Sequence, residues 1–268
     1  MCIVVVTTLA AGLMGTLAAC RIQQVAWKFV RLIAILTLCL LIPVLGSFVL
    51  WSGWQRGPVT LWGASLTAGG AMAAFVVLGF APLSRRYDQT LRLFAAGGAI
   101  LALAAAIAWG LDYRLWPQVT GWARRAAMAG QLLMAASLGS VTLATVLGHA
   151  YLTHTSMTIH PLRRLTAMFA AALTLRTIWA VLVGGGLAWL AAREGHLSVQ
   201  ALKSEWLLLG VRGFIGLLLP LVFSYMVVET ARLRATQSAT GILYFTLVLV
   251  FIGELTSLHL LRELGIAF

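Results

Sequence analysis

Seven ionisable side chains stand inside long apolar segments of this sequence, and they are its best candidates for chemistry. They are Arg31, His149, Arg176, Arg212, Glu229, Glu254 and His259. Because a charged group is costly in lipid, such residues face the interior of a helix bundle and often mark ion, proton or ligand sites. The sequence contains no Gly-rich phosphate loop, nucleophile elbow or H-E-x-x-H motif. We therefore predict no catalytic or metal-ligating residue. The candidate sites are instead sites for quinone or for protons.

Arg212 and Glu254 are the first such candidates. Arg212 lies about two turns into one apolar segment, and Glu254 lies about two turns before the end of the next. A short loop joins the two segments, so we expect them to be neighbours and the two side chains to pair. Such a pair either fixes the register of two helices or forms a proton or quinone-headgroup site.

Arg176 is placed differently, near the middle of its apolar segment and between Thr174 and Thr177. We expect no acidic residue at its depth. The arginine then either bonds to backbone carbonyls of a neighbouring helix or holds an anionic ligand, a haem propionate or a quinone carbonyl.

A third group is predicted near one face of the membrane, where His149, Tyr151, Glu229, Gln237 and Tyr244 have similar depth and could converge. Histidine exchanges protons near neutral pH, and tyrosine and glutamine can hold a carbonyl or hydroxyl. The group suits a quinone headgroup, although an ordinary polar interfacial layer has the same composition. Haem is not expected within this chain alone, because His149 and His259 lie near opposite faces of the membrane, too far apart to share one iron.

The elements that must position these residues are predicted to be transmembrane helices. The chain has 268 residues, 61% hydrophobic and 10% charged, with a mean hydropathy of +0.97. Soluble domains carry about 25% charged residues. Nearly the whole chain divides into apolar runs that, apart from the shorter first one, are long enough to cross a bilayer. These runs are Cys2–Cys20, Trp27–Trp51, Val59–Pro82, Leu91–Leu111, Trp122–Leu152, Leu162–Ala192, Trp206–Ala231 and Ala239–Leu261. We therefore predict an all-α transmembrane bundle of about eight helices, a single integral-membrane domain over residues 1–268.

The net charge of +12 reflects basic residues in the short loops, which indicate topology and anionic-lipid contact rather than a nucleic-acid partner. Nine basic residues fall on one side: Arg21, Lys28, Arg85, Arg86, Arg92, Arg163, Arg164, Arg232 and Arg234. Seven fall on the other: Arg56, Arg114, Arg124, Arg125, Arg193, Lys203 and Arg262. The positive-inside rule then predicts that both termini lie outside the cytoplasm. We expect the membrane to be the inner (plasma) membrane of a bacterial cell. Most tryptophans, Trp27, Trp109 and Trp206 among them, stand near run ends, as in an interfacial aromatic belt.

Small residues predict close helix packing at Ala68–Ala71, Ala95–Ala99 and Gly184–Gly186, although the glycine triplet could instead open a helix for a ligand. The sequence shows no internal repeat. Leu17-Ala18-Ala19-Cys20 is similar to a lipoprotein cleavage box, but no basic residue precedes it in the first six positions.

By helix number and placement of the termini, the chain resembles the eight-helix membrane anchor subunits of the dimethyl sulfoxide reductase and polysulfide reductase families. No motif is shared, so no residue role is carried over. The resemblance implies a subunit of a respiratory or photosynthetic electron-transfer complex that anchors redox partner subunits and binds quinone or quinol, without catalytic residues of its own. The alternatives are a secondary transporter or channel with a buried Arg/Glu path, and a membrane-embedded enzyme that modifies lipids.

Overall fold

The computed structural model describes residues 2–20, 25–50, 58–83, 86–110, 121–153, 159–186, 189, 193 and 204–264. Within these ranges, eight helical segments are long and apolar enough to cross a membrane. The first five are α1 (Cys2–Ala19), α2 (Trp27–Leu50), α3 (Pro58–Phe80), α4 (Asp88–Gly110) and α5 (Gly121–Thr153). The all-α transmembrane bundle predicted from hydropathy is confirmed.

The last three spans include stretches of wider helix. The sixth span is α6 (His160–Trp179), continued by the π-helical η3 (Ala180–Gly184). The seventh begins as α9 (Trp206–Gly210), widens into the π-helical η4 (Val211–Leu218) and continues as α10 (Leu219–Arg232). The eighth is α11 (Thr236–Leu264). A short 3-10 turn, η2 (Ala81–Leu83), follows α3.

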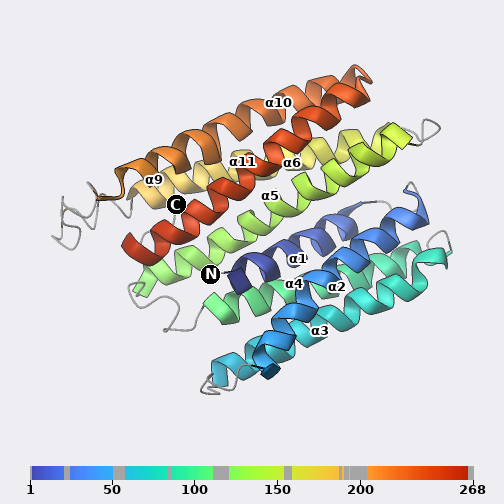
Figure 1. Ribbon diagram of the computed structural model, residues 1–268, viewed down its shortest axis with the longest axis horizontal. Coiled ribbons are helices and arrows are strands. Elements are labelled where there is room, and N and C mark those ends of the chain that lie inside the picture. Colours follow the sequence, from blue (N-terminus) through green and yellow to red (C-terminus); the bar gives the residue numbers. More distant parts are fainter. Residues whose placement is uncertain are drawn as a thin grey trace.

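The helices form two rings of four (Figure 1). In the first ring each of α1, α2, α3 and α4 packs on the next, and α4 returns to α1. The second ring repeats this order with α5, α6, the span from α9 to α10, and α11, which returns to α5. Since each ring has an even number of spans, both rings enter the membrane from the same side. The chain thus repeats one helix arrangement that its sequence does not reveal.

The two rings meet where the first helix of each, α1 and α5, lie side by side. Gly12 of α1 faces Ala135 and Gly139 of α5, and a Cβ on Gly12 would lie 2.9 Å from the Cα of Gly139. In lipid, where apolar surfaces gain little by leaving the solvent, such backbone contact lets dispersion forces hold helices together. Cys20, directly after α1, is also buried, so α1 belongs to the folded core.

Two expectations from small and aromatic residues have mixed outcomes. Gly70 and Gly98 pack against neighbouring helices, whereas a Cβ on Gly185 or Gly186 would meet no described atom within 4 Å. The glycine triplet therefore does not mark close packing at these two positions. Trp109, expected in the interfacial belt, lies near the end of α4, where it packs inside the first ring over Gly63 and is 1% exposed. The absence of a Cβ at Gly63 makes room for the indole there.

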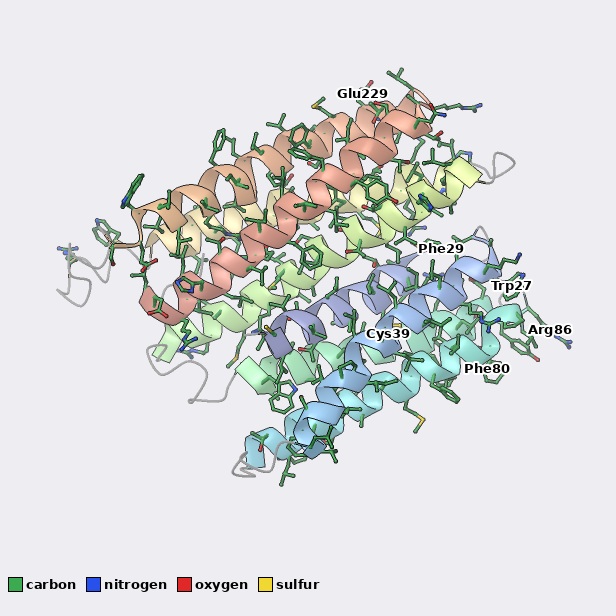
Figure 2. The ribbon with its side chains drawn as sticks, in the orientation of Figure 1. Trp27, Phe29, Cys39, Phe80, Arg86 and Glu229 are labelled. Atoms are coloured by element: carbon green, nitrogen blue, oxygen red, sulfur yellow. The ribbon has the colours of Figure 1, made fainter. Side chains whose placement is uncertain are left out.

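One end of the bundle, which we call the basic end, holds the start of α2, α4, α6 and α11 (Figure 1). Figure 2 shows Trp27, Arg86 and Glu229 toward this end, with Glu229 on the outer face of α10. The beginning of α1 and the end of α11 lie together at the opposite end.

Candidate functional site

A charge cluster of Arg176, Arg212 and Glu254 lies inside the second ring. The Arg176 guanidinium donates to both carboxylate oxygens of Glu254, from Nε to Oε1 at 3.1 Å and from Nη2 to Oε2 at 2.9 Å. Arg212 approaches from the opposite helix, with Nη1 3.5 Å from Oε1 of Glu254. The three side chains are at most 5% exposed. One carboxylate therefore joins α6, η4 and α11.

The pairing of Arg212 with Glu254 is confirmed, and the expectation that Arg176 has no acid at its depth is wrong. The apolar run Leu162–Ala192 placed Arg176 near its middle, whereas counting from the start of each helix gives Arg176 a depth that it shares with Glu254. Counted from the basic end, Arg176 is 16 residues beyond the start of α6, and Glu254 is 18 residues beyond the start of α11. At about 1.5 Å per residue, both lie about 25 Å from that end.

Glycine decides how closely the seventh and eighth spans approach at the cluster. Gly216 and Gly253 touch backbone to backbone, and a Cβ on Gly216 would lie 2.5 Å from the Cα of Gly253. Gly253 directly precedes Glu254, and Gly216 follows Arg212 by four residues, about one turn. The glycine contact therefore places the Arg212 side chain opposite the Glu254 carboxylate.

The hydroxyl groups beside Arg176 have other partners. Thr174 Oγ1 donates to the Ala170 carbonyl at 2.7 Å, and Thr177 Oγ1 donates to the Leu173 carbonyl at 2.9 Å. These bonds within α6 satisfy hydroxyls that would otherwise be costly in lipid. A serine that the sequence analysis missed does join the cluster, because Arg176 Nη2 donates to Ser257 Oγ at 3.2 Å. Ser257 lies one turn beyond Glu254 on α11, and that spacing was the available signal.

A small cavity lies between α5, α6 and α11 beside the charge cluster, with Gln131, Arg176 and Ser257 in its lining. Its volume is about 20 Å³, roughly the space of one water molecule. An aromatic ring needs far more, since a cavity of about 150 Å³ is what accommodates benzene in a protein core. This cavity is therefore too small for a quinone headgroup.

Two π-helical segments flank the cluster. Arg212 lies within η4, and η3 begins four residues after Arg176. Such wide turns are uncommon and occur often at functional sites, because the extra residue shifts side-chain directions and frees backbone groups. Their presence in both helices that carry the arginines is a feature that hydropathy gave no means to predict.

His149 and Tyr244 form a second candidate site, nearer the basic end. Their rings meet edge to face, with centroids 6.4 Å apart, across the contact between α5 and α11. Both side chains are exposed at the surface of the bundle, Tyr244 by 46%. His149 lies four residues before the end of α5, about 6 Å along the helix, so the pair is within a few turns of the membrane face.

The other residues of the predicted group have different surroundings. Tyr151 is buried and forms a hydrogen bond with the backbone of Leu162 at the start of α6. Glu229 is exposed and pairs with Arg232, whose Nη1 donates to its Oε2 at 3.3 Å. Gln237 is exposed in the first turn of α11. Of the five, His149 and Tyr244 are the two that the structure joins in a ring contact.

Among the described residues, no group of three or more His, Cys, Asp or Glu side chains is placed to hold a metal ion. Comparisons of the chain with protein-family models, with curated proteins and with solved structures gave no match. The class of the protein therefore follows from its fold, and the chain is a multi-pass, all-α membrane protein.

Proposed function

We propose that this chain is the integral-membrane subunit of an electron-transfer complex, and that it binds quinone or quinol against the His149–Tyr244 pair while anchoring redox partner subunits. The observation that carries the proposal is the ring contact between an exposed histidine and an exposed tyrosine on adjacent helices, near one membrane face. A quinone reaches its site through the lipid, and its headgroup offers two carbonyl oxygens as acceptors. A surface pair of a phenol and an imidazole supplies hydrogen-bond donors for such a ligand.

The two side chains have complementary tasks in this proposal. The Tyr244 hydroxyl donates a hydrogen bond that holds the headgroup in place. The His149 imidazole takes up or supplies a proton, because its charge changes near neutral pH. Bound quinone would supply the two-electron chemistry, which this chain does not contain. The charge cluster then serves mainly to hold the second ring together, since its cavity is too small for the headgroup.

A photoreactive azidoquinone tests the site directly in native membranes. We expect it to label peptides of α5 and α11 around His149 and Tyr244, and excess quinone to suppress the label. His149→Ala and Tyr244→Phe should reduce labelling. His149→Ala should also lower quinol-linked turnover by about 100-fold or more, as expected for loss of a proton-exchanging group. His259→Ala and Tyr225→Phe are matched controls, because Tyr225 is exposed, the His259 side chain is 42% exposed, and both residues lie away from the pair.

Purification from native membranes in mild detergent tests the complex. Cytochrome or iron–sulfur subunits should co-purify in fixed ratio, and both variants should retain them. A chain that emerges alone and monodisperse, or turnover unchanged in both variants, would contradict the proposal.

A secondary transporter is the second candidate, and the π-helical segments η3 and η4 favour it. Helices that widen beside buried charges are suited to rearrange during transport. In that case Arg176 and Arg212 should exchange partners during the cycle, and Glu254→Gln should abolish substrate or proton flux in vesicles while His149→Ala leaves it unchanged.

A further inference from the structure

A pocket at the basic end lies apart from both candidate sites. It is lined by His160, Arg163, Arg164, Ala167, Val228 and Arg232, and its volume is about 380 Å³. That size is within the range of ligand pockets in proteins, about 300 to 1,000 Å³. Its walls come from the first turns of α6 and the last turns of α10, so the pocket opens between two transmembrane spans.

The pocket has an excess of positive charge. Three arginines line it, and none of the described residues in its lining is acidic. Arg232 pairs with Glu229, just outside the lining, through side chains about 60% exposed. An ion pair so accessible to water contributes little and compensates one arginine at most. The electrostatic potential around Arg163 and Arg164 is therefore positive.

The position of those two arginines on α6 adds to the imbalance. The first turn of α6 contains no acidic residue, although the helix begins there with the positive end of its dipole. Cations at this end oppose the dipole, so the arrangement is unfavourable for α6 taken by itself. An anion between the two helices would relieve both sources of repulsion.

The pocket also has an apolar side that faces the interior of the membrane. Ala167 is one turn beyond Arg163 along α6, and Val228 is one turn before Arg232 along α10. Cations thus lie at the membrane face, and apolar groups lie one turn deeper. A phospholipid has the same order, with a phosphate at the surface and the glycerol and acyl chains below it. A free phosphate would make no use of the apolar side.

We propose that this pocket binds the phosphate group of an anionic phospholipid, with Arg163, Arg164 and Arg232 donating to the phosphate oxygens. Arginine suits this task because its planar guanidinium can donate two parallel hydrogen bonds to a phosphate. Basic pockets between transmembrane helices bind anionic lipid headgroups in this way. The site does not depend on the proposed quinone function.

Native mass spectrometry of the full chain in a neutral detergent tests the site. We expect one phosphatidylglycerol to bind saturably and phosphatidylcholine to bind much more weakly. Arg163→Gln with Arg164→Gln should weaken the binding of phosphatidylglycerol roughly 30-fold, about fivefold for each arginine near an anionic lipid. Arg86→Gln with Arg234→Gln removes the same charge from the same end outside the pocket and should change the affinity less than about threefold.

The double variant Arg163→Lys with Arg164→Lys keeps the charge and should retain most of the binding. It tests the role of charge in the pocket even if the glutamine pair fails to fold. Several results would overturn the proposal. Binding could be unchanged in the glutamine pair, or equally reduced in the control pair. Inorganic phosphate could displace the lipid at equal concentration, which would indicate a free-phosphate site. The glutamine pair could keep its lipid but lose a co-purifying protein, which would make the pocket a partner interface.

Discussion

Replacing Glu254 with glutamine removes the negative charge with which both buried arginines pair in the described part of the chain. Glutamine keeps the shape of the side chain and one acceptor for Arg176, so the change isolates the charge. The ion pairs span 2.9 Å to Arg176 and 3.5 Å to Arg212. At an effective dielectric constant of about 20, these distances correspond to about 6 and about 5 kcal/mol of attraction.

Desolvation of the three charges offsets most of that attraction, so the net effect is smaller. Breaking a buried ion pair by removing one partner typically destabilises a protein by about 3–5 kcal/mol. We expect a loss of this size for Glu254→Gln, because two guanidinium groups remain without their counter-ion. Four kcal/mol corresponds to roughly a thousandfold change in the unfolding equilibrium.

The charge balance of the cluster gives a sharper test than the size of the effect. Two positive groups share one negative group, so Arg212→Met leaves a neutral pair of Arg176 and Glu254. We therefore expect Arg212→Met to be clearly less destabilising than Glu254→Gln. Glu229→Gln serves as the control, because its pair with Arg232 is exposed and should contribute about 0–1 kcal/mol.

Unfolding in mixed micelles with increasing dodecyl sulfate, followed by circular dichroism, measures all three variants. The reasoning fails if Glu254→Gln unfolds at the same dodecyl sulfate fraction as the unmodified chain. It also fails if Arg212→Met is the more damaging of the two, because the cluster would then not be limited by its single negative charge.

Two further predictions concern packing and thiol chemistry. Gly216→Ala should destabilise the fold by about 1–3 kcal/mol in the same assay, because the added Cβ would meet the Gly253 backbone. Gly213→Ala in the same segment is the control and should be neutral or stabilising. Equal effects of the two changes would refute the backbone contact. Burial raises the pKa of Cys20 to about 11 from 9.0, despite the opposing fields of Arg164 and Arg92. The test uses a chain with Cys2→Ser and Cys39→Ser, so that Cys20 is its single thiol. Since the thiolate is the reactive form, maleimide labelling of Cys20 at pH 8 should be roughly 100-fold slower in the native protein than after denaturation. The native labelling rate should increase toward pH 11. Fast native labelling at pH 8 would show that the thiol is not buried.

The depth of a residue could be counted from the sequence only where both ends of its helix were marked. Arg212 and Glu254 lie on spans joined by a short turn, so their common depth, and with it their ion pair, was predictable. Arg176 was placed at the wrong depth because its depth was taken from the middle of the long run Leu162–Ala192 and not from the start of its helix. An apolar run longer than the bilayer does not fix which of its residues lie at the centre of the membrane.

The sequence by itself determined the class of the protein. Apolar runs of bilayer length must become helices, because lipid offers no partner to backbone amides and carbonyls. It also identified the three charged residues of the cluster and the two rings of the His149–Tyr244 pair. Beyond the Arg212–Glu254 pair, only the tertiary structure decided which of these side chains meet, and that one ring arrangement occurs twice. Helix neighbours are chosen by local fits such as Gly12 against Gly139 and Gly216 against Gly253. Such fits depend on the rotation and register of whole helices, and neither property is encoded in composition or in the spacing along one helix.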